Sequence, residues 1–342
     1  MSWHVAPATG LLTDPDHLER WRRLHAASGG SPVLAPELAC AALAAFGLGR
    51  EQLAWHVQDG EVDIMAILAP GRAGIWNTFQ PAQAPVGLWL QRDAAPRSGA
   101  VPGLLRALPG PGLMLGLTQC DPMLAARPPD TDGVRSMNYI ETARVTLPAS
   151  FEAYWDTRGK NLRTNLRKQR KRLADDGVAT RLQASRAVDE MAAAVADYGR
   201  LESAGWKAKD GTAVAADNAQ GRFYRALLEA FAGIGAACVY RYWIGERLAA
   251  MDLCIEGGGC VVVLKTAYDE GIGGALSPAL LMREDATRAI IDAGRFERIE
   301  FYGRVMEWHL RWTDEVRTMY HLNAYRWPWL GRLHARRPPG RR

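Results

Sequence analysis

Residues 261–282 read VVVLKTAYDEGIGGALSPALLM and carry the clearest fold signal in the chain. The apolar, β-branched start predicts a strand over 260–266. A glycine-rich loop at 271–277 follows, with Ser277 as the expected N-cap of a helix over 278–293 that has proline at its first position. Glycines let the backbone approach an anion, and the first N–H groups of a helix attract it. The stretch therefore predicts either an anion site or an ordinary strand–helix turn.

The loop does not carry either of the common nucleotide-binding motifs. It has no Gly-Lys-Ser/Thr, which a P-loop requires, and it does not follow the G-x-G-x-x-G spacing. The sequence thus disfavours nucleotide hydrolysis and Rossmann-type binding. Tyr268 and Asp269 stand where the strand meets the loop, so we expect them to face the cleft of this strand–helix unit.

The composition is that of a soluble globular protein. The chain has 342 residues, 48% of them apolar and 23% charged, which suggests about two domains. The longest uncharged apolar run, 38–49, is shorter than the ~20 residues of a membrane helix, and no basic-then-apolar leader opens the chain. The five cysteines are odd in number and widely spaced. They disfavour a disulfide framework or a metal site, and we expect a cytoplasmic protein.

Basic residues concentrate in the second half of the chain. Residues 1–150 hold 11 Arg, no Lys and 13 acids, a net −2, so the total of +5 leaves +7 for residues 151–342. A strongly basic helix is expected over 160–175, with Arg163, Arg167 and Arg170 on one face beside an apolar stripe of leucines. This face is either simply solvated or binds phosphate from a tRNA, a lipid headgroup or a cofactor, or the acids of a carrier protein.

Four segments in order resemble the GNAT acyltransferase superfamily. They are YWDTRGKNLRTNLRKQRKRL (154–173), ESAGWKAKDGTA (202–213), LKTAYDEGIGGALSPALLM (264–282) and IEFYGRVMEWHLRW (299–312). The branch that the chain resembles contains two GNAT folds and includes Fem-type transferases and CelD-like cellulose-biosynthesis proteins. The resemblance implies an α/β protein of tandem GNAT-like folds, with mixed central sheets flanked by helices. The expected ranges are a degenerate half at 1–145, a catalytic half at 146–330 and a basic tail at 331–342.

The resemblance also implies a CoA thioester as co-substrate, with no covalent enzyme intermediate. The pyrophosphate is expected on the glycine loop, the pantetheine along the strand before it, and a backbone N–H of that strand on the oxyanion. The implied donor-binding residues are Thr266, Ala267, Tyr268, Gly271, Gly273, Gly274 and Ser277. The implied acceptor-side residues are Arg163, Arg167, Arg170, Trp206, Lys207, Asp269 and Trp308.

A carboxylate is expected to accept the proton of the acceptor amine, directly or through water. Asp252 interrupts the apolar strand 248–255, and Glu300 lies inside Ile-Glu-Phe, so both are costly charges unless they are paired or functional. Lys265 ends the neighbouring strand and is expected to pair with one of them, although a slip of one residue would move it to the other face. A structural ion pair is the alternative for Asp252.

One departure from the family pattern concerns the residues after Gly303. Relatives usually carry Tyr-Lys six or seven residues later, whereas this chain has Trp308-His309. His309 is either a group that titrates near pH 7 or a structural residue. Tyr302 is a candidate proton donor to the leaving thiolate or a packing residue. Trp308, Trp312, Trp327 and Trp329 are expected to pack the C-terminal segment, with an aromatic-lined acyl site as the alternative.

Three functions remain open from the sequence. The first is an N-acyltransferase that moves an acyl group from acyl-CoA, or acyl carrier protein, to a primary amine of a small molecule or peptide. The second is a Fem-type transferase that uses aminoacyl-tRNA, with the basic helix on the acceptor stem. The third is a non-catalytic protein whose GNAT-like fold only binds an anion.

Overall fold

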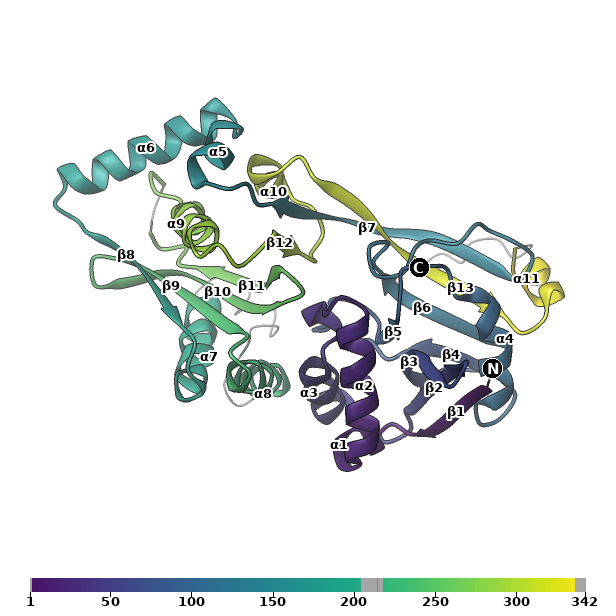
Figure 1. Ribbon diagram of the computed structural model, residues 1–342. Coiled ribbons are helices and arrows are strands. Elements are labelled where there is room, and N and C mark those ends of the chain that lie inside the picture. Colours follow the sequence, from purple (N-terminus) through teal and green to yellow (C-terminus); the bar gives the residue numbers. More distant parts are fainter. Residues whose placement is uncertain (1, 204–213, 215–217, 273, 336–342) are drawn as a thin grey trace. The chain divides into compact units, whose positions relative to one another are not determined.

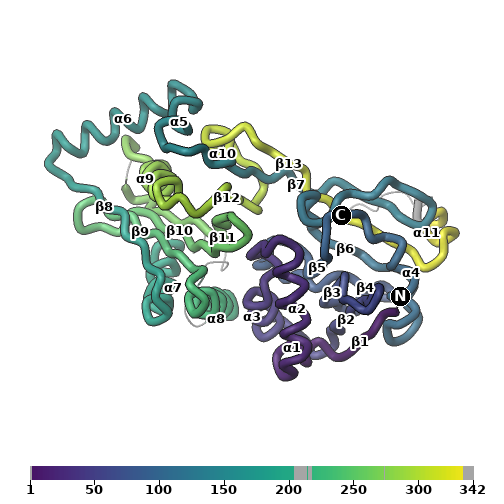
Figure 2. The backbone as a smooth tube through the Cα atoms, in the orientation of Figure 1, coloured from purple at the N-terminus to yellow at the C-terminus, as the bar shows by residue number. Residues whose placement is uncertain are grey.

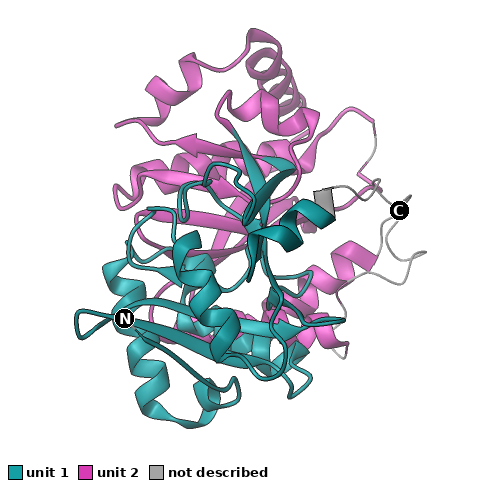
Figure 3. Cartoon of the chain, turned by 90° about the vertical axis from the view of Figure 1, so that its right-hand side faces the viewer, with its two compact units in different colours: residues 1–141, 317–342 teal, residues 142–316 magenta. Residues whose placement is uncertain are grey.

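The computed structural model describes residues 2–203, 214, 218–272 and 274–335, and it divides into two compact units (Figures 1 and 3). Unit 1 comprises Met1–Glu141 and Arg317–Arg342, and unit 2 comprises Thr142–Val316. The expected α/β class, with mixed sheets flanked by helices, is confirmed.

Unit 1 contains a mixed sheet in the order β1-β2-β3-β4-β6-β13-β7, with β5 paired to β3. Its strands are β1 (Ser2–Pro7), β2 (Gln52–Gln58), β3 (Glu61–Pro70), β4 (Ile75–Thr78), β5 (Trp89–Gln91), β6 (Met114–Cys120), the first part of β7 (Val134–Thr146) and β13 (Val316–Tyr325). Its helices are α1 (Gly10–Thr13), α2 (Pro15–Ala27), α3 (Pro36–Phe46), α4 (Val101–Ala107) and α11 (Pro328–Ala335).

Unit 2 contains a mixed sheet in the order β7-β12-β11-β10-β9-β8. After the last part of β7, its strands are β8 (Thr180–Ser185), β9 (Ala237–Ile244), β10 (Arg247–Gly257), β11 (Cys260–Tyr268) and β12 (Arg298–Phe301). Its helices are α5 (Phe151–Asp156), α6 (Lys160–Asp175), α7 (Val188–Ser203), α8 (Ala219–Gly233), α9 (Pro278–Asp292) and α10 (Glu307–Trp312). Figure 2 traces β9, β10 and β11 as successive antiparallel strands.

The boundary of the units differs from the expected ranges at the C-terminal end. The sequence-based ranges assign residues 317–330 to the second half. The strand β13 instead pairs antiparallel with β6, from Tyr320↔Cys120 to Tyr325↔Met114, which joins these residues to unit 1. Strand pairing over so long a sequence separation leaves no local signal in the sequence.

The sheet of unit 2 lies between two helical layers (Figure 1). Along β9, alternate side chains point to opposite faces. Tyr240 and Tyr242 join the core cluster that includes α9, whereas Arg241 donates to Asp197 of α7 across 2.9 Å. The helix α9 therefore covers one face of the sheet, and α7 and α8 cover the other.

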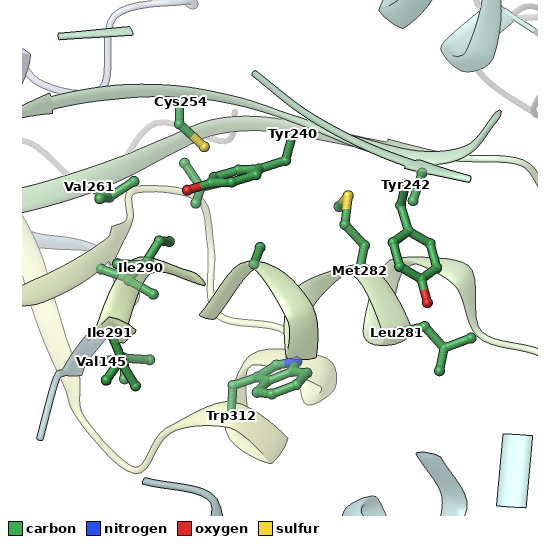
Figure 4. Packing of buried hydrophobic residues seen from close by; sticks show 14 of the residues in the cluster. Val145, Tyr240, Tyr242, Cys254, Val261, Leu281, Met282, Ile290, Ile291 and Trp312 are labelled. Atoms are coloured by element: carbon green, nitrogen blue, oxygen red, sulfur yellow. The ribbon is translucent and has the colours of Figure 1, made fainter. Parts of the chain in front are cut away.

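The core beneath α9 is formed by aromatic and aliphatic side chains. Figure 4 shows Tyr240 and Cys254 directed from the strands toward Met282 and Ile290 of α9, with Trp312 of α10 on the far side of that helix. Leu162, Leu166 and Leu173 are all buried in this cluster, so the expected apolar stripe does dock the basic helix α6. This packing fixes α6 and α9 relative to the strands that carry the candidate site.

Candidate functional site

The strands β11 and β12 separate in the middle of unit 2. They pair in parallel from Cys260↔Arg298 to Val262↔Glu300, and β11 then continues to Tyr268 while β12 ends at Phe301. Beyond this point the described pairing of β11 is with β10 alone. The edge of β11 that faced β12 thus presents backbone N–H and C=O groups that a ligand can meet.

The loop after β11 leads into the N-terminus of α9, as expected. Asp269 accepts hydrogen bonds from Arg247 (2.5 Å) and from the N–H of Gly271 (2.8 Å), which holds the start of the loop. Gly274 has φ +35°, and a Cβ built there would meet no atom within 4 Å. Ser277 occupies the N-cap position without a side-chain capping bond. The loop therefore combines open space beside Gly274 with the backbone N–H groups at the start of α9.

The basic helix α6 is tied to this end of α9. The buried amide of Gln169 accepts the N–H of Ser277 at 2.7 Å. Arg170 binds Glu284 at 2.8 Å and Asp285 at 2.6 Å. These bonds place the basic face of α6 beside α9.

A pocket of about 520 Å³ opens along that basic face. Its lining residues are Trp155, Lys160, Arg163, Thr164, Arg167, Arg170 and Glu284. The three arginines expected to share a face therefore line one pocket. Arg163 has an ion pair with Asp156 at 3.3 Å and Arg170 has two, so the pocket carries both neutralised and exposed cations.

Asp252 is fully buried and bound on both oxygens. Its Oδ2 lies 2.6 Å from Nη1 of Arg283, and its Oδ1 accepts Nη2 of Arg283 at 2.9 Å and the hydroxyl of Thr266 at 2.6 Å. Burial raises the pKa of Asp252, and the Arg283 guanidinium opposes that shift. The geometry is that of a buried ion pair joining β10, β11 and α9, which is the structural alternative considered for this residue.

Arg283 was missed by the sequence reasoning. It follows Leu280-Leu281-Met282 on the buried stripe of α9 and is 3% exposed. Its guanidinium lies 5.1 Å from the ring of Phe301 and 5.8 Å from that of Trp308. The detectable signal was an arginine at the helical spacing of buried residues such as Ala286 and Ile290, a position where a charge requires a partner.

His309 lies beside the same guanidinium. Its ring stacks on Trp308 with 3.6 Å between centroids, and its Nδ1 accepts the N–H of Met306 at 3.0 Å. Burial, together with the charge of Arg283, lowers the pKa of His309 to about 4. His309 is therefore neutral at pH 7, which argues against its interpretation as a group titrating there.

Lys265 points away from Asp252. The pairing of β10 with β11 shifts between Leu253↔Lys265 and Cys254↔Val263, so Leu264 is an extra residue in β11. This bulge reverses the alternation of side chains after Val263. Lys265 consequently lies on the α7–α8 side, with Nζ 3.7 Å from Glu202 and 5.8 Å from the ring of Tyr224. Of the two pairings considered for Lys265, with Asp252 or with Glu300, the one with Asp252 is not formed, because the bulge moves Lys265 to the other face.

Glu300 also lies on the face opposite Asp252. Its neighbours Ile299 and Phe301 both enter the cluster beneath α9, so the intervening side chain points to the other side of β12. Glu300 is 4% exposed and accepts a hydrogen bond from Nε of Arg298 at 3.2 Å. It is the last residue of β12 that pairs with β11. Tyr302, two residues later, is half-buried. Glu300 therefore marks the point where the two strands part.

The remaining expected site residues are distributed around this point. Ala267 is buried and Tyr268 is 46% exposed at the end of β11. Trp206, Lys207 and Gly273 lie outside the described residues. Within the described ranges, His, Cys, Asp and Glu side chains form no group that could hold a metal ion. No helix in the described part of the chain has the length and apolar character needed to cross a membrane.

Comparisons with known proteins identify the fold around this site. Residues 160–328 match the family model described as acetyltransferase (GNAT) domain. The comparison with curated proteins gives no match.

Several solved structures share the fold at low sequence identity. The C-terminal domain of a candidate lysylphosphatidylglycerol synthetase from Agrobacterium fabrum is 13% identical, with 90% of this chain and 91% of that one covered and a TM-score of 0.54. The structure described as L-PGS from Bacillus licheniformis is 13% identical, covering 96% and 98%, with a TM-score of 0.51. FemX is 9% identical, covering 80% and 88%, with a TM-score of 0.52.

These structures extend over both units, so the chain as a whole shares a Fem-like two-part fold. The match to the family model covers the separating strands, the glycine loop, α9 and the Asp252–Arg283 pair. Residues 160–328, just under half of the chain, therefore match the acetyltransferase (GNAT) domain family.

Proposed function

We propose that the chain is an N-acyltransferase that moves an acyl group from a CoA thioester, or acyl carrier protein, to a primary amine. The observation that carries this proposal is the free edge of β11 beyond Val262, which runs into the glycine loop at the N-terminus of α9. Such an edge can orient an extended amide-bearing chain, and such a loop can receive a phosphate group.

The residues present fit a CoA-type donor. Thr266, Ala267 and Tyr268 supply backbone groups at the end of β11, and the side of the loop at Gly274 has room because a Cβ there meets nothing within 4 Å. The first turn of α9 carries no acidic residue that would repel an anion. When bound, the thioester would supply an activated acyl carbon; the protein residues hold the donor and manage the proton.

We assign Glu300 rather than Asp252 as the proton acceptor. Asp252 is fully buried and the Arg283 guanidinium contacts both of its oxygens, whereas Arg298 contacts Glu300 at Oε1, at 3.2 Å. Glu300 stands where β11 and β12 part, next to the edge that receives the donor. In this assignment Asp252 is a positioning residue that fixes Thr266 of β11 against α9.

A second candidate is aminoacyl transfer from a charged tRNA. The basic pocket along α6 favours it, because exposed cations beside the donor loop suit a polyanionic donor. The structural neighbours of the chain include FemX, the C-terminal domain of a candidate lysylphosphatidylglycerol synthetase and a protein named L-PGS. Binding without turnover is the third option, and only a kinetic measurement separates it from the other two.

Donor identity is tested by thermal shift with CoA, acyl-CoAs of several chain lengths and aminoacyl-tRNA. A donor at a hundredfold excess over its Kd stabilises the folded protein by about 2.7 kcal/mol. Gly274→Val should abolish the stabilisation by CoA compounds, because the side chain fills the side of the loop that is open. Gly235→Val is the matched control, since Gly235 is also at positive φ with no atom within 4 Å of a built Cβ.

Stabilisation by acyl-CoA that the loop variant loses and the control keeps supports the proposal. Stabilisation by aminoacyl-tRNA alone replaces it with the second candidate. An unchanged affinity for CoA in the Gly274→Val protein removes the loop from the site.

A further inference from the structure

The segment that ends unit 1 exposes large aromatic side chains. Trp327 and Trp329 are 41% and 49% exposed, and their rings stack with centroids 6.1 Å apart and planes inclined by 12°. Leu333 is 52% exposed and lies four residues after Trp329, on the same side of α11. The two tryptophans thus pack against each other within the C-terminal segment, as expected, but at the surface of unit 1. We call Trp327, Trp329 and Leu333 the α11 edge.

The opposite side of α11 is the one that packs. Gly331 is buried there, and a Cβ added to it would clash with the backbone oxygen of Asp132. Arg332 adds an ion pair with Asp132 at 3.1 Å. The helix is thus anchored on the turn before β7 through one side, and the apolar side faces outward. Burial of apolar surface against this turn cannot explain why the outward residues are Trp and Leu.

One arginine lies against the α11 edge, and the sequence of this segment is rich in arginine. The guanidinium of Arg326 lies 4.8 Å from the ring centroid of Trp327. In sequence, residues 326–342 hold six arginines and no aspartate or glutamate, and four of those arginines follow α11. Asp132 offsets Arg332, but the excess of positive charge along the segment remains. The α11 edge therefore combines aromatic and aliphatic side chains with Arg326, in a segment whose sequence is positively charged.

We infer that the α11 edge docks the protein on an anionic lipid surface. Tryptophan is favoured at the headgroup level of a bilayer, where its ring is apolar and its N–H finds a polar partner. Leucine at 333 adds apolar area that enters the acyl boundary, and arginines attract the negative surface. This inference does not depend on the reaction that unit 2 carries out.

RNA is the competing partner for arginines and aromatic rings. A stacking platform offers ring faces to bases, whereas Trp327 and Trp329 already stack on each other. Leu333, which has no ring to stack, completes the same edge. The composition of the edge therefore favours lipid over nucleic acid.

Co-sedimentation with vesicles tests the inference on the full chain. The vesicles are pure phosphatidylcholine or equal parts phosphatidylcholine and phosphatidylserine; the serine lipid supplies charge and is not the lipid named in the structural neighbours. The variant is Trp327→Ala with Trp329→Ala. Its matched control is Leu48→Ala with Ile234→Ala, two residues that are 72% and 60% exposed elsewhere.

The protein should bind the anionic vesicles at low salt, and the double tryptophan variant should bind about tenfold more weakly. The control should bind as the parent protein does, and Leu333→Asp should reproduce the loss without removing a ring. Absence of binding to anionic vesicles overturns the inference, as does equal binding by the tryptophan variant. A tRNA complex that the variant loses, with no vesicle binding by the parent, assigns the edge to nucleic acid instead.

Discussion

Removing the guanidinium of Arg283 should destabilise the protein in a strongly pH-dependent way. The side chains of Asp252 and Arg283 are 0% and 4% exposed, so solvent does not screen the pair. Arg283→Met keeps the aliphatic stem in place and leaves Asp252 buried without its cation. Breaking a buried pair by removing one partner costs about 3–5 kcal/mol.

The loss of folding free energy in Arg283→Met has an upper limit. An unpaired Asp252 can escape by taking a proton, since burial already raises its pKa in the folded state. Relative to an unfolded pKa of about 3.9, protonation costs about 1.36 kcal/mol per pH unit, hence about 4 kcal/mol at pH 7 and about 1.5 kcal/mol at pH 5. A raised folded pKa means that stability is lost as pH rises above the unfolded value. The destabilisation by Arg283→Met should therefore grow from pH 5 to pH 7.

Asp252→Asn should destabilise the protein to the same extent at each pH, because it leaves the Arg283 guanidinium buried without its carboxylate. Arginine keeps its proton throughout this range, so the loss should be about 3–5 kcal/mol at both pH 5 and pH 7. The double variant removes both charges and should recover most of the stability that each single change loses.

Urea unfolding at pH 5, 6 and 7 measures these differences, with the slope checked for each variant. Arg225→Met is the matched control, since its pair with Glu229 in the same unit is 59% and 32% exposed and is worth less than about 1 kcal/mol. An Arg283→Met loss that stays constant between pH 5 and pH 7, or remains under about 1 kcal/mol, would refute the reasoning.

Three further predictions concern the site itself. Glu300→Gln should lower turnover about 10²–10⁴-fold with donor affinity unchanged, measured by initial rates and calorimetry; an equal loss in donor affinity would make Glu300 structural. Arg163→Gln with Arg167→Gln should weaken binding of a polyanionic donor and flatten its salt dependence while acyl-CoA binding stays the same, whereas Lys171→Gln with Arg172→Gln, on the same helix outside the pocket, should change neither. Because burial lowers the pKa of His309 to about 4, the parent protein should lose stability relative to His309→Asn as the pH falls from 6.5 toward 4; a difference in Tm that does not vary with pH contradicts this.

The local features of unit 2 could be predicted from the sequence. The strand, glycine loop and helix around 260–292 and the basic face of α6 all follow from residue type and helical or strand spacing. These signals are local, since each is set by neighbours within a few turns or a single strand.

What could not be predicted depends on contacts between distant segments. The bulge at Leu264 reverses the side of Lys265, and nothing in the strand's composition marks an extra residue. The spacing of Arg283 marks it as buried, but its partner is identified only when β10 places Asp252 beneath α9. Trp327 and Trp329 were expected to pack the C-terminal segment, but the sequence does not show that the anchoring of α11 through Gly331 leaves them exposed. The environment of each of these side chains is therefore set by strand register, ion pairing or helix orientation, which involve distant segments of the chain.

The position of the Asp252–Arg283 pair gives a reason for a charge pair in the core. A buried ion pair is weak evidence for stability, because apolar residues of similar volume often stabilise as well. The contribution of the Asp252–Arg283 pair lies instead in the way it orients the elements around it. Thr266 donates to Asp252 from β11, and Arg283 reaches from α9 toward Phe301 of β12 and Trp308 of α10.

An apolar contact could slide among these elements, whereas two ionic bonds and one hydroxyl bond to a single carboxylate fix their spacing. The strand that carries the proposed donor edge and the helix whose N-terminus closes the loop are thereby held to one carboxylate. Trp308, expected on the acceptor side, and His309, a catalytic candidate, pack against the same guanidinium or its aromatic neighbours. The pair thus holds β11 and α9 in a fixed relation at the point where β11 and β12 part. This structural role is the reason why we propose Glu300, and not Asp252, as the proton acceptor.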